Sequence, residues 1–297
     1  MILRLDIKTL LQSFCDEYAH LDFEQLIDYF AIFGGAGQTI EFDFFDTLFE
    51  LIETKFVSNF SFFQSLIAPS YLLESPYREV LMAIARGDGK IYSALKKAKL
   101  SETVGEKIVK DLTNLGVIHL EASTELVLNV SRKYRIQDKL RFNMPFYRFW
   151  FGFVEPFRSS LEQGDAARFI EYFKAHYERL RSLIFEQLSN ELLCEYFEAH
   201  NKKIIFSGSY WDRDNEFDIV AITDKKEMIV AECKYKDRKV CKNELTKLKL
   251  KASQSGLPAT YWALFSKQGF SGELLVMKDK NLFLFDLQDF QKWIMCI

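Results

Sequence analysis

The stretch from Ile204 to Tyr235 constrains the fold more than any other, because short apolar runs alternate there with polar turns. The pattern predicts three strands at the centre of a sheet. Asp-Lys-Lys-Glu at 224–227 predicts a tight turn that joins the last two strands as a hairpin. The predicted strands are Lys203–Ser207, Phe217–Ile222 and Met228–Tyr235.

Three charged residues interrupt these apolar strands. Residues two apart in a strand lie on one face, so Glu232 and Lys234 point the same way and Cys233 points to the other face. Asp218 opens the apolar run of the neighbouring strand, and the hairpin register can bring it beside Glu232. A carboxylate in a buried strand is costly unless its charge is compensated. The pattern therefore predicts a charged site on this face.

Two carboxylates with a lysine nearby suit a hard divalent cation. Proteins usually hold Mg²⁺ with one or two carboxylates, several waters and a substrate phosphate. Such an ion polarises a phosphoryl oxygen, and a lysine can position the attacking water. The sequence predicts Mg²⁺ or Mn²⁺ bound by Asp218 and Glu232, with Lys234 in a catalytic role. The alternative is an ordinary exposed strand face, because Glu-x-Lys is a common surface triplet.

Asp218 followed by Glu232-Cys233-Lys234 resembles the core of the PD-(D/E)xK nuclease superfamily. The resemblance implies a restriction-endonuclease-like α/β domain over 181–297, with a mixed central sheet flanked by helices. A helix over Lys242–Ser255 and strands over Pro258–Ser266 and Leu282–Leu287 follow the hairpin in the expected order.

The helical stretch before the first strand offers further carboxylates. Asp165–His200 has the apolar spacing of one long or two consecutive helices. The resemblance implies an assisting carboxylate here, and Glu186 is the candidate catalytic residue, with Glu178 and Glu191 as alternatives. Glu216, two residues before Asp218 and on the same face, is a further possible ligand.

Residues 1–74 are predicted to form an acidic helical segment, with 3 basic and 12 acidic side chains. This charge makes a basic protein partner one expectation for the segment. Gly34-Gly35-Ala36-Gly37 is predicted to be a helix–helix turn. It lacks the lysine of a phosphate-binding loop and no strand precedes it, so we expect no nucleotide cofactor.

Residues 75–133 are predicted to form a winged helix-turn-helix. Basic residues on its third helix, Lys107 and Lys110, favour DNA as a partner, although such modules also serve as protein-interaction units. The predicted helices run from Pro76 to Arg86, from Ile91 to Ala98 and from Ser101 to Leu115, and the predicted wing strands are Val117–Leu120 and Leu126–Val130.

Residues 134–180 are predicted to form an aromatic helical linker. The dense run from Met144 to Pro156 is apolar at nearly every position, which favours a core between domains over a base-stacking surface.

Five short patterns occur in order along residues 134–255. They are Tyr134-Arg135-Ile136-x-Asp138, Phe149-Trp150-Phe151-x-Phe153-Val154, Phe185-Glu186, Glu216-Phe217-Asp218-Ile219-Val220 after Trp211, and Glu232-Cys233-Lys234. The series resembles the C-terminal domain of unknown function 234 of archaeal-type ATPases, which is thought to be nuclease-like. Members of this family typically carry a P-loop ATPase module, but residues 1–74 are too short for one. The resemblance therefore leaves an ATPase partner acting in trans as one expectation.

Composition and local patterns argue against a membrane protein and against a secreted protein. No apolar run approaches the roughly 20 residues that span a bilayer, and the N-terminus lacks the pattern of a signal peptide, so no membrane partner is expected. Five scattered cysteines predict reduced thiols in a cytoplasmic protein. None of the four histidines forms a metal-binding pattern. The sequence predicts a Mg²⁺-dependent DNA phosphodiesterase; the main alternative is a non-catalytic regulator that binds nucleic acid or protein.

Overall fold

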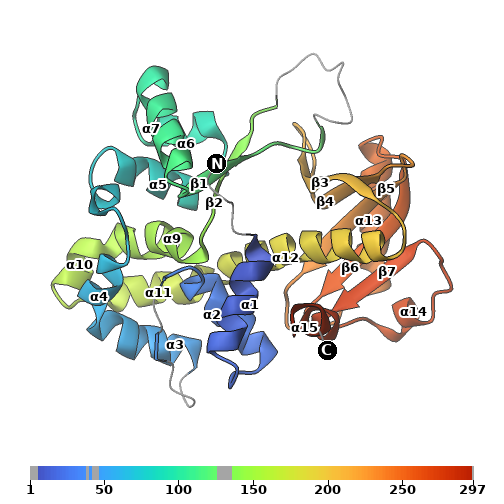
Figure 1. Cartoon of the computed structure of the whole chain (residues 1–297), viewed down its shortest axis with the longest axis horizontal. Helices are drawn as coiled ribbons and strands as arrows, with labels where there is room; N and C mark the ends of the chain where they lie inside the picture. The colour runs from blue at the N-terminus through green and yellow to red at the C-terminus, as the bar shows by residue number, and fades with distance from the viewer. Residues whose placement is uncertain (1–5, 38–39, 42–46, 126–135, 296–297) are drawn as a thin grey trace. The chain divides into compact units, whose positions relative to one another are not determined.

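The computed structural model describes residues 6–37, 40–41, 47–125 and 136–295 of the chain (Figure 1). Its elements cluster into two compact units. The first comprises Met1–Glu121 and Gln137–Arg181, and the second comprises Ala122–Ile136 and Ser182–Ile297. Asp218, Glu232, Lys234 and Glu186 belong to the second unit, whereas the alternative Glu178 belongs to the first.

The first unit is mainly helical. Helix α2 begins with a capping box, in which the Asp22 side chain accepts from the Gln25 backbone and the Gln25 side chain accepts from the Asp22 backbone. The helices are α1 (Ile7–Glu17), α2 (Phe23–Phe33), α3 (Leu48–Leu51) continued by a π-helical turn (Ile52–Phe56), α4 (Phe60–Ser65), α5 (Tyr77–Arg86), α6 (Ile91–Lys97), α7 (Glu102–Asn114), α9 (Pro145–Phe149) continued by a π-helical turn (Trp150–Val154), α10 (Arg158–Glu162) and α11 (Ala167–His176).

The predicted aromatic linker lies in the core of this first unit. Phe149 and Trp150 are completely buried. The Phe149 ring lies 5.4 Å from that of Phe56 and 6.4 Å from that of Phe33. The Trp150 indole donates a hydrogen bond of 3.0 Å to the buried Glu155 carboxylate. The run is therefore packed against residues of the acidic N-terminal segment.

The three helices predicted for the winged helix are present as α5, α6 and α7. The wing differs from the prediction. Strand β1 (Ile118–Glu121) pairs antiparallel with β2 (Lys139–Phe142), and Arg141 forms an ion pair of 2.5 Å with Glu121 across them. The predicted partner Leu126–Val130 lies outside the described residues.

The second unit contains a five-stranded mixed sheet in the order β3-β4-β5-β6-β7. The first three strands are antiparallel and the last three are parallel. All three strands of the predicted motif are present, and the first extends further than predicted, through two irregularities in its pairing. The strands are β3 (Ile204–Trp211), β4 (Glu216–Thr223), β5 (Met228–Lys234), β6 (Ala259–Ser266) and β7 (Leu282–Asp286).

Helices cover both faces of this sheet (Figure 1). Leu245, Leu248 and Ala252 of α13 (Lys242–Gln254) form one core cluster with Val220 and Val230 of the strands. The opposite face carries α12 (Glu178–Ala199) and α15 (Leu287–Met295), whose aromatic rings contact one another and those of the sheet in tilted and edge-to-face pairs. A short helix α14 (Gly272–Leu275) precedes β7. The chain therefore follows the predicted order of hairpin, helix and strand.

The short segment that contains Ser123 and Thr124 supports the sheet edge. Ser123 both donates to the Trp211 carbonyl at 2.7 Å and accepts from its backbone N–H at 2.9 Å. Thr124 donates to the Ser209 carbonyl at 2.8 Å. These contacts satisfy part of the backbone of edge strand β3.

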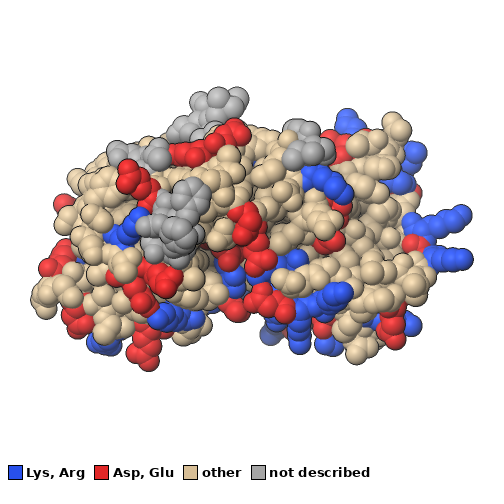
Figure 2. Space-filling view, turned by 90° about the horizontal axis from the view of Figure 1, so that it is seen from below, with Lys and Arg blue, Asp and Glu red and all other residues tan. Residues whose placement is uncertain are grey.

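Four cysteines within the described ranges, Cys15, Cys194, Cys233 and Cys241, are free thiols. None of the helices in those ranges combines the length and apolar character needed to cross a membrane. Acidic and basic side chains both gather in groups on the face shown in Figure 2. The net charge of −3 thus hides local concentrations of each sign.

Candidate functional site

Asp218 and Glu232 lie on the same face of the sheet, on neighbouring strands. Strands β4 and β5 pair antiparallel with Ile219 opposite Ala231 and Val220 opposite Val230. The next step in this register places Asp218 opposite Glu232. Residues opposite each other in an antiparallel pair share a face. The predicted juxtaposition of the two carboxylates is therefore present.

Asp218 is partly buried beside this second carboxylate. One of its oxygens accepts a hydrogen bond of 2.7 Å from the Cys233 backbone N–H. Burial, followed by the negative charge of Glu232, raises the pKa of Asp218 from 3.8 to about 6, against the opposing effects of Lys234 and Lys251. The two carboxylates thus repel each other, and the site favours a bound positive charge.

Lys234 supplies one such charge. Its ammonium group forms an ion pair with Glu232, and the two side chains are 25% and 19% exposed. Burial by itself lowers the pKa of Lys234, but the charge and hydrogen bond of Glu232 outweigh it and raise the pKa overall. Lys234 is therefore held as a cation next to the carboxylate pair.

The opposite face of β5 carries Cys233, whose side chain alternates with those of Glu232 and Lys234. Burial, the charge of Asp218 and then the charge of Glu186 raise the pKa of this thiol well above its usual range. Glu186 therefore approaches the sheet from the α12 face, at Cys233. Its assisting role in catalysis stays a prediction, as do the alternatives on the same helix.

Glu216, the further candidate ligand, begins β4 with an exposed side chain. Its backbone carbonyl accepts a hydrogen bond from the Lys251 ammonium group. Lys251 also lies 4.5 Å above the Phe217 ring. This lysine, which the sequence analysis did not single out, brings a second positive charge toward Asp218 from helix α13.

The donor set suits a hard divalent cation in the way that Mg²⁺ usually binds. Asp218 and Glu232 offer oxygen atoms, and their mutual repulsion is relieved when a cation lies between them. Within the described ranges, no group of three or more His, Cys, Asp or Glu side chains is arranged to hold a metal ion. Two protein carboxylates, with water and substrate completing the coordination, are the arrangement that fits.

A basic pocket adjoins this site and was missed by the sequence analysis. It encloses about 290 Å³ and is lined by Lys234, Lys236, Arg238, Lys239, Val240, Cys241, Asn243, Glu244 and Lys247. The sequence does show a cluster of cationic residues between Lys234 and Lys251. It does not show that the loop and helix α13 fold together so that several of these side chains line one pocket.

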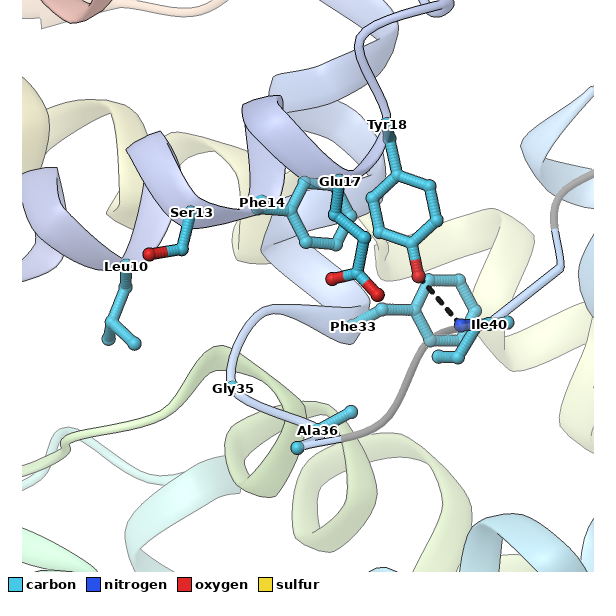
Figure 3. Close-up of a pocket in the computed structure, with 10 residues that line it drawn as sticks. Leu10, Ser13, Phe14, Glu17, Tyr18, Phe33, Gly35, Ala36 and Ile40 are labelled. Carbon is cyan, nitrogen blue, oxygen red and sulfur yellow. Dashed lines mark hydrogen bonds between the residues drawn. The ribbon is translucent and has the colours of Figure 1, made fainter.

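A second cavity, of about 310 Å³, lies in the first unit beside the Gly34–Gly37 turn (Figure 3). Rings of Phe14, Tyr18 and Phe33 line it, and the Tyr18 hydroxyl accepts a hydrogen bond of 2.7 Å from the Ile40 backbone. The turn follows the end of α2, where the Gly34 N–H bonds to the Phe30 carbonyl. Of the predicted helix–helix turn, the end of α2 at Gly34 is present.

Comparison with known proteins confirms the predicted family for one stretch of the chain. Residues 150–248, about a third of the sequence, match domain of unknown function 234, described as "Archaea bacterial proteins of unknown function". The matched range contains Glu186, Asp218, Glu232 and Lys234. No curated protein matches the chain.

One solved structure is similar to the chain at low level, the crystal structure of protein VC1899 from Vibrio cholerae. The two are 13% identical with a TM-score of 0.31. The match covers 82% of this chain and 52% of that chain, so this chain spans about half the length of the solved protein.

Proposed function

We propose that the second unit is a phosphodiesterase that cleaves DNA with the help of Mg²⁺ or Mn²⁺, with a restriction-endonuclease-like fold. The observation that carries the proposal is the placement of Asp218 opposite Glu232, with Lys234 ion-paired to the latter. Paired carboxylates beside a lysine on one sheet face are the groups that metal-assisted phosphoryl chemistry requires.

The topology around these residues supports the same proposal. The hairpin β4–β5 carries the three polar groups, helix α13 crosses over the sheet, and β6 returns parallel to β5. Helix α12 covers the other face and carries Glu186. This order is the one that the resemblance to the nuclease superfamily implies.

Each residue has a separate role in the proposed reaction. Asp218 and Glu232 would hold the metal ion, which when bound supplies a polarised phosphoryl oxygen and an activated water. Lys234 donates hydrogen bonds from a position next to the scissile phosphate and stabilises the negative charge that develops there. Glu232 also orients this lysine through their ion pair. Glu186 approaches the opposite face of the sheet, at Cys233, and is given no step in the proposed reaction.

The first unit is proposed to dock the substrate. Helices α5 to α7 and the β1–β2 pair form three helices and a hairpin, which is the composition of a winged helix. Lys107 and Lys110 of α7 would contact DNA phosphates.

The test is cleavage of duplex and single-stranded DNA with Mg²⁺ or Mn²⁺. We expect Asp218→Asn and Lys234→Ala to lower the rate by about 100-fold or more, the usual effect of removing one group that stabilises transition-state charge. Lys225→Ala, in the exposed hairpin turn, is the matched control and should retain full activity. Equal cutting by wild type and both site variants, or no cutting by any of them, would refute the proposal.

A non-catalytic regulator that binds nucleic acid is the second candidate. The ion pair between Lys234 and Glu232 favours it, because each charge already has a partner within the chain. In this case DNA affinity should fall steeply with salt while no cleavage product forms. A gel-shift series over salt concentration, run beside the cleavage assay, separates the two candidates.

A further inference from the structure

The basic pocket next to Lys234 combines a concave shape with a strong excess of positive charge. Five cationic side chains and one carboxylate, that of Glu244, line its volume of about 290 Å³. Its walls come from two elements that are consecutive in the chain, the loop after β5 and the first turns of α13. All of these residues belong to the second unit.

Three of the five cations have no carboxylate partner within the described part of the chain. Lys234 is paired with Glu232, and Lys247 forms an ion pair of 3.2 Å with Glu244. No ion pair involves Lys236, Arg238 or Lys239, and all three are exposed. The pocket therefore keeps a net positive charge that internal pairing does not neutralise.

The acidic residue within this loop does not cancel that charge. Asp237 forms an ion pair of 2.5 Å with Lys267, which is 3% exposed and lies over the Tyr235 ring at 5.2 Å. Asp237 is also absent from the pocket lining. The alternation of residues along the loop thus turns the aspartate toward a buried lysine and leaves its basic neighbours facing the pocket.

These charges select the class of ligand. Clustered cations repel a metal ion and offer little to an apolar ligand, whereas phosphate oxygens accept hydrogen bonds from both lysine and arginine. The first turn of α13 adds backbone N–H groups, which also favour an anion. A concave site of this charge, next to a site for phosphodiester cleavage, concentrates anionic substrate.

Resting on the proposed function, we infer that the basic pocket binds a second phosphate of the DNA strand, next to the phosphate that is cleaved. Lys234 belongs to both sites, so a strand bound in the pocket extends directly to the carboxylate pair. Arg238 and Lys239 are the main phosphate contacts, with Lys236 beside them. The pocket thereby holds the strand in position, and the carboxylate pair acts on it.

The test measures DNA binding without cleavage, using fluorescence anisotropy of a short labelled duplex and a single strand in EDTA. The variant Arg238→Gln/Lys239→Gln removes two exposed charges, so it should fold as the wild type does, which a thermal melt checks. We expect its DNA affinity to fall about tenfold or more. The slope of log affinity against log salt concentration should become shallower by about one for each cation that is removed. Lys278→Gln/Lys280→Gln removes the same charge elsewhere in the second unit and should bind as the wild type does.

Two versions of each probe distinguish the source of the phosphate. Each probe carries either a 5′-phosphate or a 5′-hydroxyl. If the pocket variant binds more weakly than wild type only to probes with a 5′-phosphate, the pocket binds a strand end. If the variant loses affinity equally for both kinds of probe, the pocket binds the internal backbone. Equal affinity of the pocket variant and wild type for all probes would overturn the inference.

The outcomes for the pocket and for the active site are separable. If the pocket variant binds normally while wild type cleaves and Asp218→Asn does not, the inference fails and the proposed function stands. If the pocket variant loses affinity but wild type never cleaves, the pocket binds phosphate and the proposed phosphodiesterase activity fails. The Asp218→Asn variant should retain DNA affinity in EDTA, because it removes a negative charge near the bound strand.

Discussion

Replacing Asp218 by asparagine should stabilise the metal-free protein while abolishing its proposed activity. The folded protein holds this carboxylate next to Glu232 in a partly buried position. Asparagine has nearly the same shape, and its side-chain oxygen still accepts the hydrogen bond that the Cys233 N–H donates over 2.7 Å. The substitution therefore removes the charge and keeps the contact.

The size of the effect follows from the pKa of Asp218, which rises from 3.8 to about 6 on folding. Because the folded state holds its proton more tightly than the unfolded state, wild-type stability falls as pH rises from about 4 to 6. At neutral pH the ionised carboxylate then costs about 3 kcal/mol, at 1.36 kcal/mol per pH unit. An amide also costs energy to bury, so we expect a net gain of about 1–3 kcal/mol.

The assay is urea denaturation of wild type and Asp218→Asn in EDTA at several pH values. The variant should be more stable at pH 8, and the difference should vanish below about pH 3, where wild-type Asp218 is protonated in both states. Added Mg²⁺ should stabilise wild type, by about 2.7 kcal/mol at 100 times its dissociation constant, and leave the variant unchanged. A variant that is less stable than wild type at pH 8 would refute the electrostatic account of this site.

Three further substitutions test the packing. Phe185→Ala empties a completely buried position between two aromatic rings at 5.1 and 4.8 Å, and should cost about 3–5 kcal/mol in urea denaturation. Asp28→Asn leaves the buried Arg181, 2.8 Å away, without its main countercharge, and the same measurement should show a loss of about 3 kcal/mol. Gly105→Ala should lower the melting temperature although alanine favours helix, because the added carbon would lie 2.4 Å from the Leu95 side chain.

Matched changes at exposed positions serve as controls for these three. Leu275→Ala, at a side chain that is 63% exposed, should change stability little. Asp16→Asn makes the same chemical change as Asp28→Asn on an exposed face of α1, and Glu106→Ala adds helix propensity next to Gly105 without a clash. A control that destabilises as much as its partner would show that packing at the named position is not the cause.

The placement of Asp218, Glu232 and Lys234 on one face was predictable because it depends on short-range order. Alternation along β5 separates Glu232 and Lys234 from Cys233, and a four-residue turn sets which residue of β4 lies opposite. The remaining carboxylate, Glu186, is distant in sequence and reaches the sheet through helix packing. Its position at Cys233 therefore emerges only from the folded unit.

The aromatic run at 144–156 shows what the sequence could not predict, namely the partners of a buried segment. Its composition marks it as buried, but a hydrophobic contact has no direction, so the sequence cannot say which distant residues cover it. In the folded unit, Phe149 of this run packs against Phe33 and Phe56, about 90 to 120 positions earlier in the chain. The pairing of β1 with β2 was also missed, because Leu126–Val130 was predicted as the partner of β1.

By itself, the sequence determined strands β3, β4 and β5, helices α5, α6 and α7, and the face that carries Asp218, Glu232 and Lys234, because each depends on periodicity and turns within a few residues. The tertiary structure alone decided the aromatic core of the first unit, the basic pocket and the raised pKa of Asp218. These depend on burial and on charges brought together by folding, and burial is a property of the packed chain and not of any local pattern.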